Sequence, residues 1–190
     1  MRVVVYDRTD GGLSRVWGAG SALYRGLRRV DAAQGVESWD EALTWIATLP
    51  EPITELQYWG HGKWGAALVD DDVLDASSLH RLEGLREQLA PDALVWFRTC
   101  ETFGARRGID FAERLGDFLG VRVAGHTFII HFHQSGLHAL APGSRADWSE
   151  EEGLKAGSAA DPQRARRSAP WAPRTITCLA GSVPDAWLTR

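Results

Sequence analysis

Apolar residues form two kinds of pattern along the chain: short runs, and longer stretches with helical spacing. The runs at residues 2–6 and 93–97 are nearly continuous, which is typical of strands buried on both faces, and residues 53–59 alternate in part. Strands are predicted at residues 2–6, 53–59, 93–97, 121–124 and 174–179. Helices are predicted at residues 21–29, 38–49, 77–89 and 109–119.

Strands and helices therefore alternate along the chain with short links. This order predicts an α/β fold with a mostly parallel central sheet, helices on both faces and right-handed crossovers, which is a three-layer sandwich. A length of 190 residues suffices for one apolar core, so we expect residues 1–190 to form a single domain. Residues 142–173 are rich in turn-forming residues and predict a long irregular excursion before residues 174–179 return to the sheet.

Composition narrows the functional classes. A net charge of -4 argues against a nucleic-acid partner, because such proteins carry a basic footprint for phosphates. No run approaches the roughly 20 apolar residues that cross a bilayer, so no membrane partner is expected. The chain opens on a predicted strand rather than a signal peptide, and we expect a cytoplasmic location.

The chain has two cysteines, Cys100 and Cys178, too few for a disulfide framework, and we expect both to be free. Cys178 lies in the last predicted strand and is expected in the core. Cys100 follows the strand at 93–97, where one alternative is an inert buried thiol.

Two reactive side chains follow neighbouring predicted strands. His61 closes the strand at 53–59 and Cys100 closes the strand at 93–97, and chemistry in parallel sheets collects at such carboxyl ends. An adjacent imidazole and the start of the next helix both favour a thiolate. The amide of Gly62 could donate to the oxyanion formed when a thiolate attacks a carbonyl. The alternative for His61 is a turn residue between two glycines.

The segments YWGHG at 58–62 and FRTCETFG at 97–104 resemble the caspase-like, or clan CD, cysteine peptidases and the related CHAT domains. The resemblance covers residues 53–130. It implies a cysteine endopeptidase with Cys100 as nucleophile and His61 as general base or acid, and the amides of Gly62 and Cys100 in the oxyanion hole. It implies a protein or peptide substrate and no cofactor. Glu101 departs from the family pattern, in which the residue after the nucleophile is often small or followed by glycine. A carboxylate in this position is expected to raise the pKa of the thiol.

The resemblance also implies where the substrate binds. The family builds its specificity pocket at the end of the first strand and two residues before the nucleophile, which here means Asp7, Arg8 and Arg98, with Glu101 beside them. Arg98 would favour an acidic substrate residue, whereas Asp7 or Asp10 would favour a basic one. A salt bridge between one of these aspartates and Arg98 is the remaining alternative.

A cluster of histidines suggests a second enzyme class, a metal-dependent hydrolase. Two of them, His131 and His133, would share one face of a strand, a spacing that can ligate zinc. Asp147 could complete such a site, and the other reading is hydrogen-bonded or surface histidines. The cluster consists of His126, His131, His133 and His138.

A third hypothesis is a caspase-like domain that has lost activity and binds a partner. Nine tryptophans are many for this length, and such residues are enriched at interfaces, although loop packing also explains them. Those predicted in loops or at element ends are Trp17, Trp59, Trp64, Trp148, Trp171 and Trp187.

A glycine-rich segment at residues 18–23 imitates a dinucleotide fingerprint. Leu23 replaces the third glycine, and the segment does not follow a strand directly, so a nucleotide site is not expected. We expect this segment to be a loop that shapes a substrate groove or lid.

Overall fold

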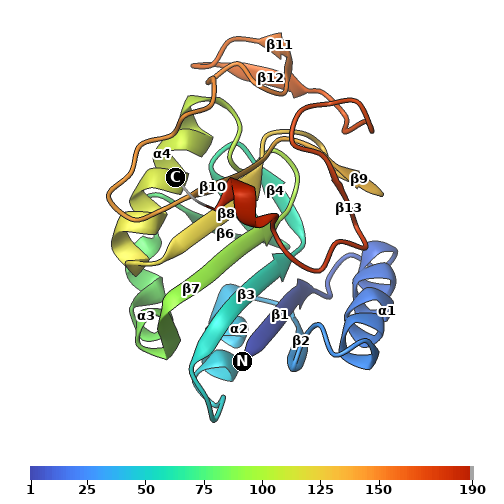
Figure 1. Ribbon diagram of the computed structural model, residues 1–190, viewed down its shortest axis with the longest axis vertical. Helices are drawn as coiled ribbons and strands as arrows, with labels where there is room; N and C mark the ends of the chain where they lie inside the picture. The colour runs from blue at the N-terminus through green and yellow to red at the C-terminus, as the bar shows by residue number, and fades with distance from the viewer. Residues whose placement is uncertain (189–190) are drawn as a thin grey trace.

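The computed structural model describes residues 1–188. Its centre is a six-stranded sheet in the order β10-β8-β7-β3-β1-β2, in which all neighbours are parallel except β10 and β8 (Figure 1). The predicted α/β fold with a mostly parallel sheet is therefore confirmed. The strands of this sheet are β1 (Arg2–Asp7), β2 (Ala32–Val36), β3 (Ile53–Trp59), β7 (Leu89–Arg98), β8 (Arg122–His126) and β10 (Leu137–Leu140).

The helices are α1 (Leu13–Gly26), α2 (Trp39–Ile46), α3 (Glu83–Gln88) and α4 (Ala105–Leu119), with 3₁₀ turns η1 (Leu79–Leu82) and η2 (Asp185–Trp187). The Ser38 side chain caps α2 by accepting the backbone N–H of Glu41 at 3.1 Å. Gly120 ends α4 with a φ of 69°, a left-handed conformation that suits glycine. Within residues 1–188, no helix is long and apolar enough to cross a membrane.

Helix α1 begins earlier than predicted and includes the glycine-rich segment at 18–23. A Cβ at Gly20 would lie 3.1 Å from the Trp59 ring, so this glycine lets the helix approach the sheet closely. The prediction of a loop or lid at this segment was wrong, because its small residues serve helix-to-sheet packing.

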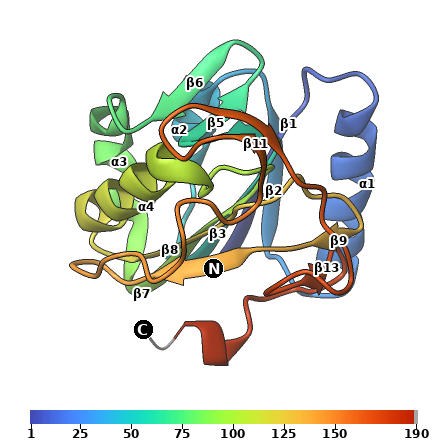
Figure 2. The ribbon, with the colours of Figure 1, turned by 90° about the horizontal axis from the view of Figure 1, so that it is seen from above.

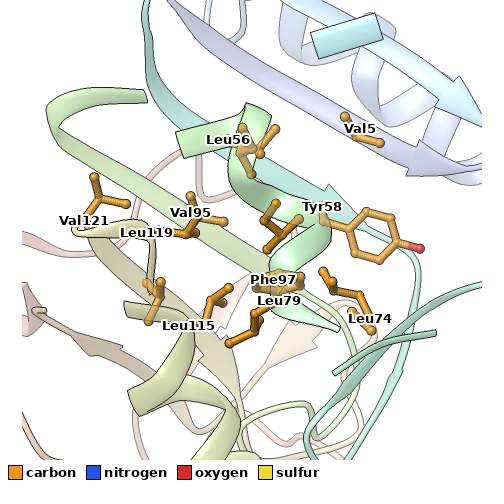
Figure 3. Close-up of a cluster of buried hydrophobic side chains, with 14 of the residues drawn as sticks. Val5, Leu56, Tyr58, Leu74, Leu79, Val95, Phe97, Leu115, Leu119 and Val121 are labelled. Atoms are coloured by element: carbon orange, nitrogen blue, oxygen red, sulfur yellow. The ribbon is translucent and has the colours of Figure 1, made fainter. Parts of the chain in front are cut away.

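One face of the sheet carries the larger apolar core (Figure 3). Val3 and Val5 of β1 belong to this cluster, together with residues of α2, α3 and α4. Figure 2 shows these three helices on one side of the sheet and the C-terminal segment on the other. Figure 3 labels Val5, Leu56, Tyr58, Leu74, Leu79, Val95, Phe97, Leu115, Leu119 and Val121 of this core.

The other face carries two smaller apolar clusters. Val4 packs with Tyr24 of α1, which places α1 against this face, and Trp96 packs with Val183 of the C-terminal segment. Side chains alternate across a strand, so Val4 faces away from the larger core.

Three small sheets are separate from the central sheet. Segment 174–179 was predicted to return to the main sheet, which was wrong, because its strand β13 (Ile176–Thr177) pairs with β9 (His133–Gln134) instead. The predicted excursion at 142–173 contains a short hairpin of β11 (Leu154–Gly157) and β12 (Pro162–Ala165). The third small sheet consists of β4 (His61–Lys63), β5 (Ala66–Val69) and β6 (Asp72–Asp75).

Candidate functional site

His61 and Cys100 both lie at the carboxyl edge of the central sheet. Strands β3 and β7 are parallel neighbours, and their final residues, Trp59 and Arg98, are register partners. His61 follows Trp59 by two residues and Cys100 follows Arg98 by two. The predicted placement of both residues at the ends of adjacent strands is therefore confirmed.

The segments that carry these two residues are joined by packing and by backbone hydrogen bonds. The N–H groups of Trp64 and Gly65 donate to the carbonyl oxygens of Glu101 and Thr102, at 3.1 and 2.8 Å. A Cβ at Gly62 would come within 2.1 Å of the Thr102 Oγ1. Only glycine fits there, so Gly62 allows the β4 segment to sit directly against the Cys100 loop.

His61 forms a pair with Asp10, a carboxylate expected either to favour a basic substrate residue or to pair with Arg98. Its Nε2 lies 3.1 Å from Asp10 Oδ2, and Trp17 of α1 packs edge-on, with ring centroids 5.5 Å apart. Asp10 also accepts the N–H groups of Gly12 and Leu13 at 3.0 Å each. These bonds, with Leu13 as the largest cause, lower the pKa of Asp10, so the carboxylate is charged and can orient the imidazole.

The Cys100 sulfur faces the backbone of a neighbouring segment. It lies 3.8 Å from the carbonyl oxygen of Ile130, and in residues 1–188 no hydrogen bond joins it to His61. Burial, followed by the negative charge of Glu101, raises the pKa of Cys100 to about 11. In this arrangement the group is a thiol at neutral pH, so attack requires a base that removes its proton.

Glu101 occupies an unusual position beside the thiol. Its φ of 33° is in the left-handed region and its side chain is buried. Its Oε2 has no hydrogen-bond partner among residues 1–188. Burial raises the pKa of this carboxyl to about 7, although the charge of Lys63 opposes the shift. The loop holds the backbone here through the N–H of Glu101, which donates to the Phe128 carbonyl at 3.0 Å.

The residues predicted to form a specificity pocket do not gather around an opening. Asp7 is fully buried and accepts the backbone N–H and the hydroxyl of Thr9, at 2.7 and 2.6 Å. Arg8 is exposed and forms ion pairs with Glu37 and Glu41. The predicted salt bridge between Arg98 and an aspartate was wrong. Asp7 is bonded to Thr9, Asp10 pairs with His61, and Arg98 has other partners.

Arg98 is buried on the sheet face that carries α1. Its guanidinium donates to Gln134 Oε1 at 2.8 and 3.1 Å and to the Tyr24 hydroxyl at 3.0 Å. It also donates to the carbonyl oxygens of Cys178 and Ala180, at 3.1 and 3.2 Å. Burial lowers the pKa of Arg98. Arg98 therefore holds the C-terminal segment on the sheet, rather than facing an open substrate pocket.

A groove of about 810 Å³ lies between the small sheet β4–β6 and the first turn of α4. Apolar side chains such as Trp64, Leu68 and Val73 share its walls with the cations Lys63 and Arg107. Apolar walls with a few charged groups are typical of sites that bind a peptide or small molecule. This groove was not predicted from the sequence, because the short strands β4–β6 that form it have no strong apolar pattern.

The four histidines do not form a metal site. Within residues 1–188 no group of three metal-ligating side chains converges. His126 is fully buried beside the Ser135 carbonyl at 3.1 Å, and His138 pairs with Glu152 at 2.7 Å. Asp147 forms an ion pair with Arg174 at 3.9 Å. These contacts match the alternative of hydrogen-bonded histidines.

The six tryptophans considered for a partner surface differ in exposure. Trp171 is 86% exposed, whereas Trp59 and Trp148 are buried. Trp148 stacks on Phe103 and His138, with ring centroids 6.1 and 4.5 Å apart. Trp59 and Trp148 therefore match the packing alternative and do not offer a partner surface.

Comparison of the chain with protein-family models, with curated proteins and with solved structures gave no match.

Proposed function

We propose that this protein is a caspase-like cysteine hydrolase that cleaves a peptide bond with Cys100 as nucleophile and His61 as proton carrier. The observation that carries the proposal is the seating of Gly62 against the Cys100 loop, which brings the His61 segment and the thiol to one edge of the sheet. A charged Asp10 beside His61 supplies the group that orients the base.

The reaction uses only groups of this chain and water. His61 removes the proton from the Cys100 thiol, and the sulfur attacks the carbonyl carbon to give a tetrahedral oxyanion. The amides of Gly62 and Cys100 stabilise this oxyanion. The C–N bond then breaks as His61 protonates the leaving amine, and water hydrolyses the thioester to a carboxylic acid and the free thiol. The reaction requires the sulfur to leave the Ile130 carbonyl and approach His61.

The groove between β4–β6 and α4 is the proposed binding site for the peptide. Trp64 lines this groove, and its backbone N–H donates to the Glu101 carbonyl in the Cys100 loop. Both cysteines are free, and a reducing compartment such as the cytoplasm would keep them so.

Alkylation of Cys100 tests the proposal directly. Cys178→Ser provides a background with one thiol, and iodoacetamide then reports on Cys100 alone. His61→Ala should slow alkylation at pH 7.5 at least tenfold, since the imidazole is the proposed base, while His80→Ala, an exposed histidine elsewhere, should not. In the His61→Ala protein the alkylation rate should keep rising as pH increases toward about 11, the pKa of the buried Cys100 thiol.

A second candidate is an inactive caspase-like module that binds a partner. The raised pKa of Cys100 and the sulfur's contact with Ile130 favour it. In that case His61→Ala would leave the alkylation rate unchanged, and cleavage of a mixed fluorogenic peptide library would be the same with and without Cys100→Ala.

A further inference from the structure

The β11–β12 hairpin and the segment after it form a basic groove of about 730 Å³. Four exposed cations line it, and Ile129 and Ala165 provide an apolar floor. No ion pair among residues 1–188 involves any of these cations, although the chain as a whole carries a net charge of -4. The cations are Lys155, Arg164, Arg166 and Arg167.

Backbone hydrogen bonds connect this groove to the thiol. The N–H of Ile129 donates to the Arg166 carbonyl at 2.9 Å, and the N–H of Ser168 donates to the Ile129 carbonyl at 2.8 Å. The next residue, Ile130, supplies the carbonyl beside the Cys100 sulfur. A single segment, residues 128–130, therefore separates the basic groove from the Cys100 loop.

The cations are held on ordered backbone at the catalytic edge. Arg164 lies on β12, paired with Ala156 of β11, and the Arg166 Nε donates to the Leu154 carbonyl at 2.9 Å. Figure 1 shows β11 and β12 at the end of the molecule toward which β1, β3 and β7 point. A polypeptide that reaches Cys100 thus passes close to this hairpin.

We infer that the basic groove binds an acidic stretch of the protein substrate, separate from the residues at the scissile bond. This inference rests on the proposed function, because it identifies the substrate class of the same site. Arginine forks pair with carboxylates in bidentate geometry, and the apolar floor accommodates intervening aliphatic side chains. The apolar floor of Ile129 and Ala165 favours an acidic polypeptide over the sugar–phosphate backbone of a nucleic acid.

Binding is measured on the Cys100→Ala protein, so that no turnover is needed. The probe is a fluorescein-labelled peptide of glutamate and leucine, compared with the same peptide carrying glutamine. Lys155→Gln, Arg164→Gln and Arg167→Gln together should weaken binding of the acidic peptide at least tenfold. Arg166 is left intact because its side chain bonds the hairpin.

The matched control removes three exposed arginines elsewhere, Arg15→Gln, Arg25→Gln and Arg86→Gln, and changes the net charge equally. The control should bind the acidic peptide like the parent protein. Equal weakening in both variants, binding of the glutamine peptide as tight as that of the acidic one, or stronger binding of a single-stranded oligonucleotide would each overturn the inference.

Failure of the inference and failure of the proposed function give different results. If the acidic peptide binds through the groove but His61→Ala does not slow Cys100 alkylation, the docking site stands and the catalytic proposal fails. If alkylation depends on His61 but the triple variant binds the acidic peptide normally, the catalytic proposal stands and the docking inference is overturned.

Discussion

The two faces of the central sheet are stabilised by different means. The face toward α2, α3 and α4 is built almost entirely from apolar contacts, among them Phe97 and Phe111, whose ring centroids are 5.7 Å apart. The face toward α1 and the C-terminal segment buries Gln57, Arg98 and His126 among its apolar residues. Apolar packing is non-directional and tolerates local adjustment, whereas buried polar groups must all find partners.

The polar face depends on one guanidinium. Arg98 lies over the Trp96 ring, 4.5 Å from its centroid, and its hydrogen bonds connect β7 with Tyr24, Gln134 and the C-terminal segment. Loss of an apolar side chain leaves a cavity on the first face. Loss of Arg98 leaves several acceptors without donors on the second.

Truncation on the apolar face should have the largest effect. Phe111→Ala should lower the free energy of unfolding by about 3–5 kcal/mol, because Phe111 is fully buried between Phe97 and Phe103. Urea unfolding measures this change. The exposed Phe132 is the control, and Phe132→Ala should change stability by about 0.5 kcal/mol or less. Similar losses for both variants would show that this core is not the main source of stability.

Removal of the guanidinium should be somewhat less costly but more localised. Arg98→Met should destabilise the protein by about 3 kcal/mol, because the carbonyls of Cys178 and Ala180 lose their donor. Amide hydrogen exchange should increase at residues 176–183, and not in α4. The control, Arg114→Met, removes an exposed arginine from α4 and should affect neither quantity. Unchanged hydrogen exchange at residues 176–183 would contradict the role of Arg98 in holding the C-terminal segment on the sheet.

Acid should weaken the polar face selectively. Burial is the main cause that lowers the pKa of His126 to about 3, so below about pH 6.5 the unfolded chain binds a proton that the folded protein does not. The contribution of His126 to stability should therefore fall by about 2 kcal/mol at pH 5, whereas protonation of Glu101, whose pKa is raised to about 7, acts in the opposite direction. His126→Phe should remove the first contribution, so this variant should gain stability relative to the parent protein as pH drops from 6.5 to 5, and the exposed His80→Gln should follow the parent profile. The same pH profile in all three proteins would contradict this role of His126.

Sequence patterns predicted the parts of the fold that follow from apolar burial. Strands β1, β3, β7 and β8 are apolar runs, and α4 has helical spacing closed by Gly120. Strand β2, with the sequence AAQGV, has little β-branched character, and its pairing with β1 comes from tertiary context. The short strands β4–β6 were not predicted either, because their pairing with one another also comes from tertiary context.

The site was predictable only in part. His61 and Cys100 follow strands that the pattern identified, and parallel pairing puts the strand ends together. The Asp10 partner of His61 depends on how the loop after β1 folds back, which no local pattern encodes. Arg98 was expected at a substrate pocket because the family resemblance implies one two residues before the nucleophile. Its burial depends on partners that lie up to 82 positions away in the chain.

The hydrogen bonds from Arg98 to Cys178 and Ala180 also constrain the order in which the two faces of the sheet can fold during synthesis. During translation, residue 98 leaves the ribosome long before residue 178 is made. Until then the guanidinium lacks these two carbonyl acceptors and stays hydrated, so the second face of the sheet closes only after residues 178–180 have been synthesised.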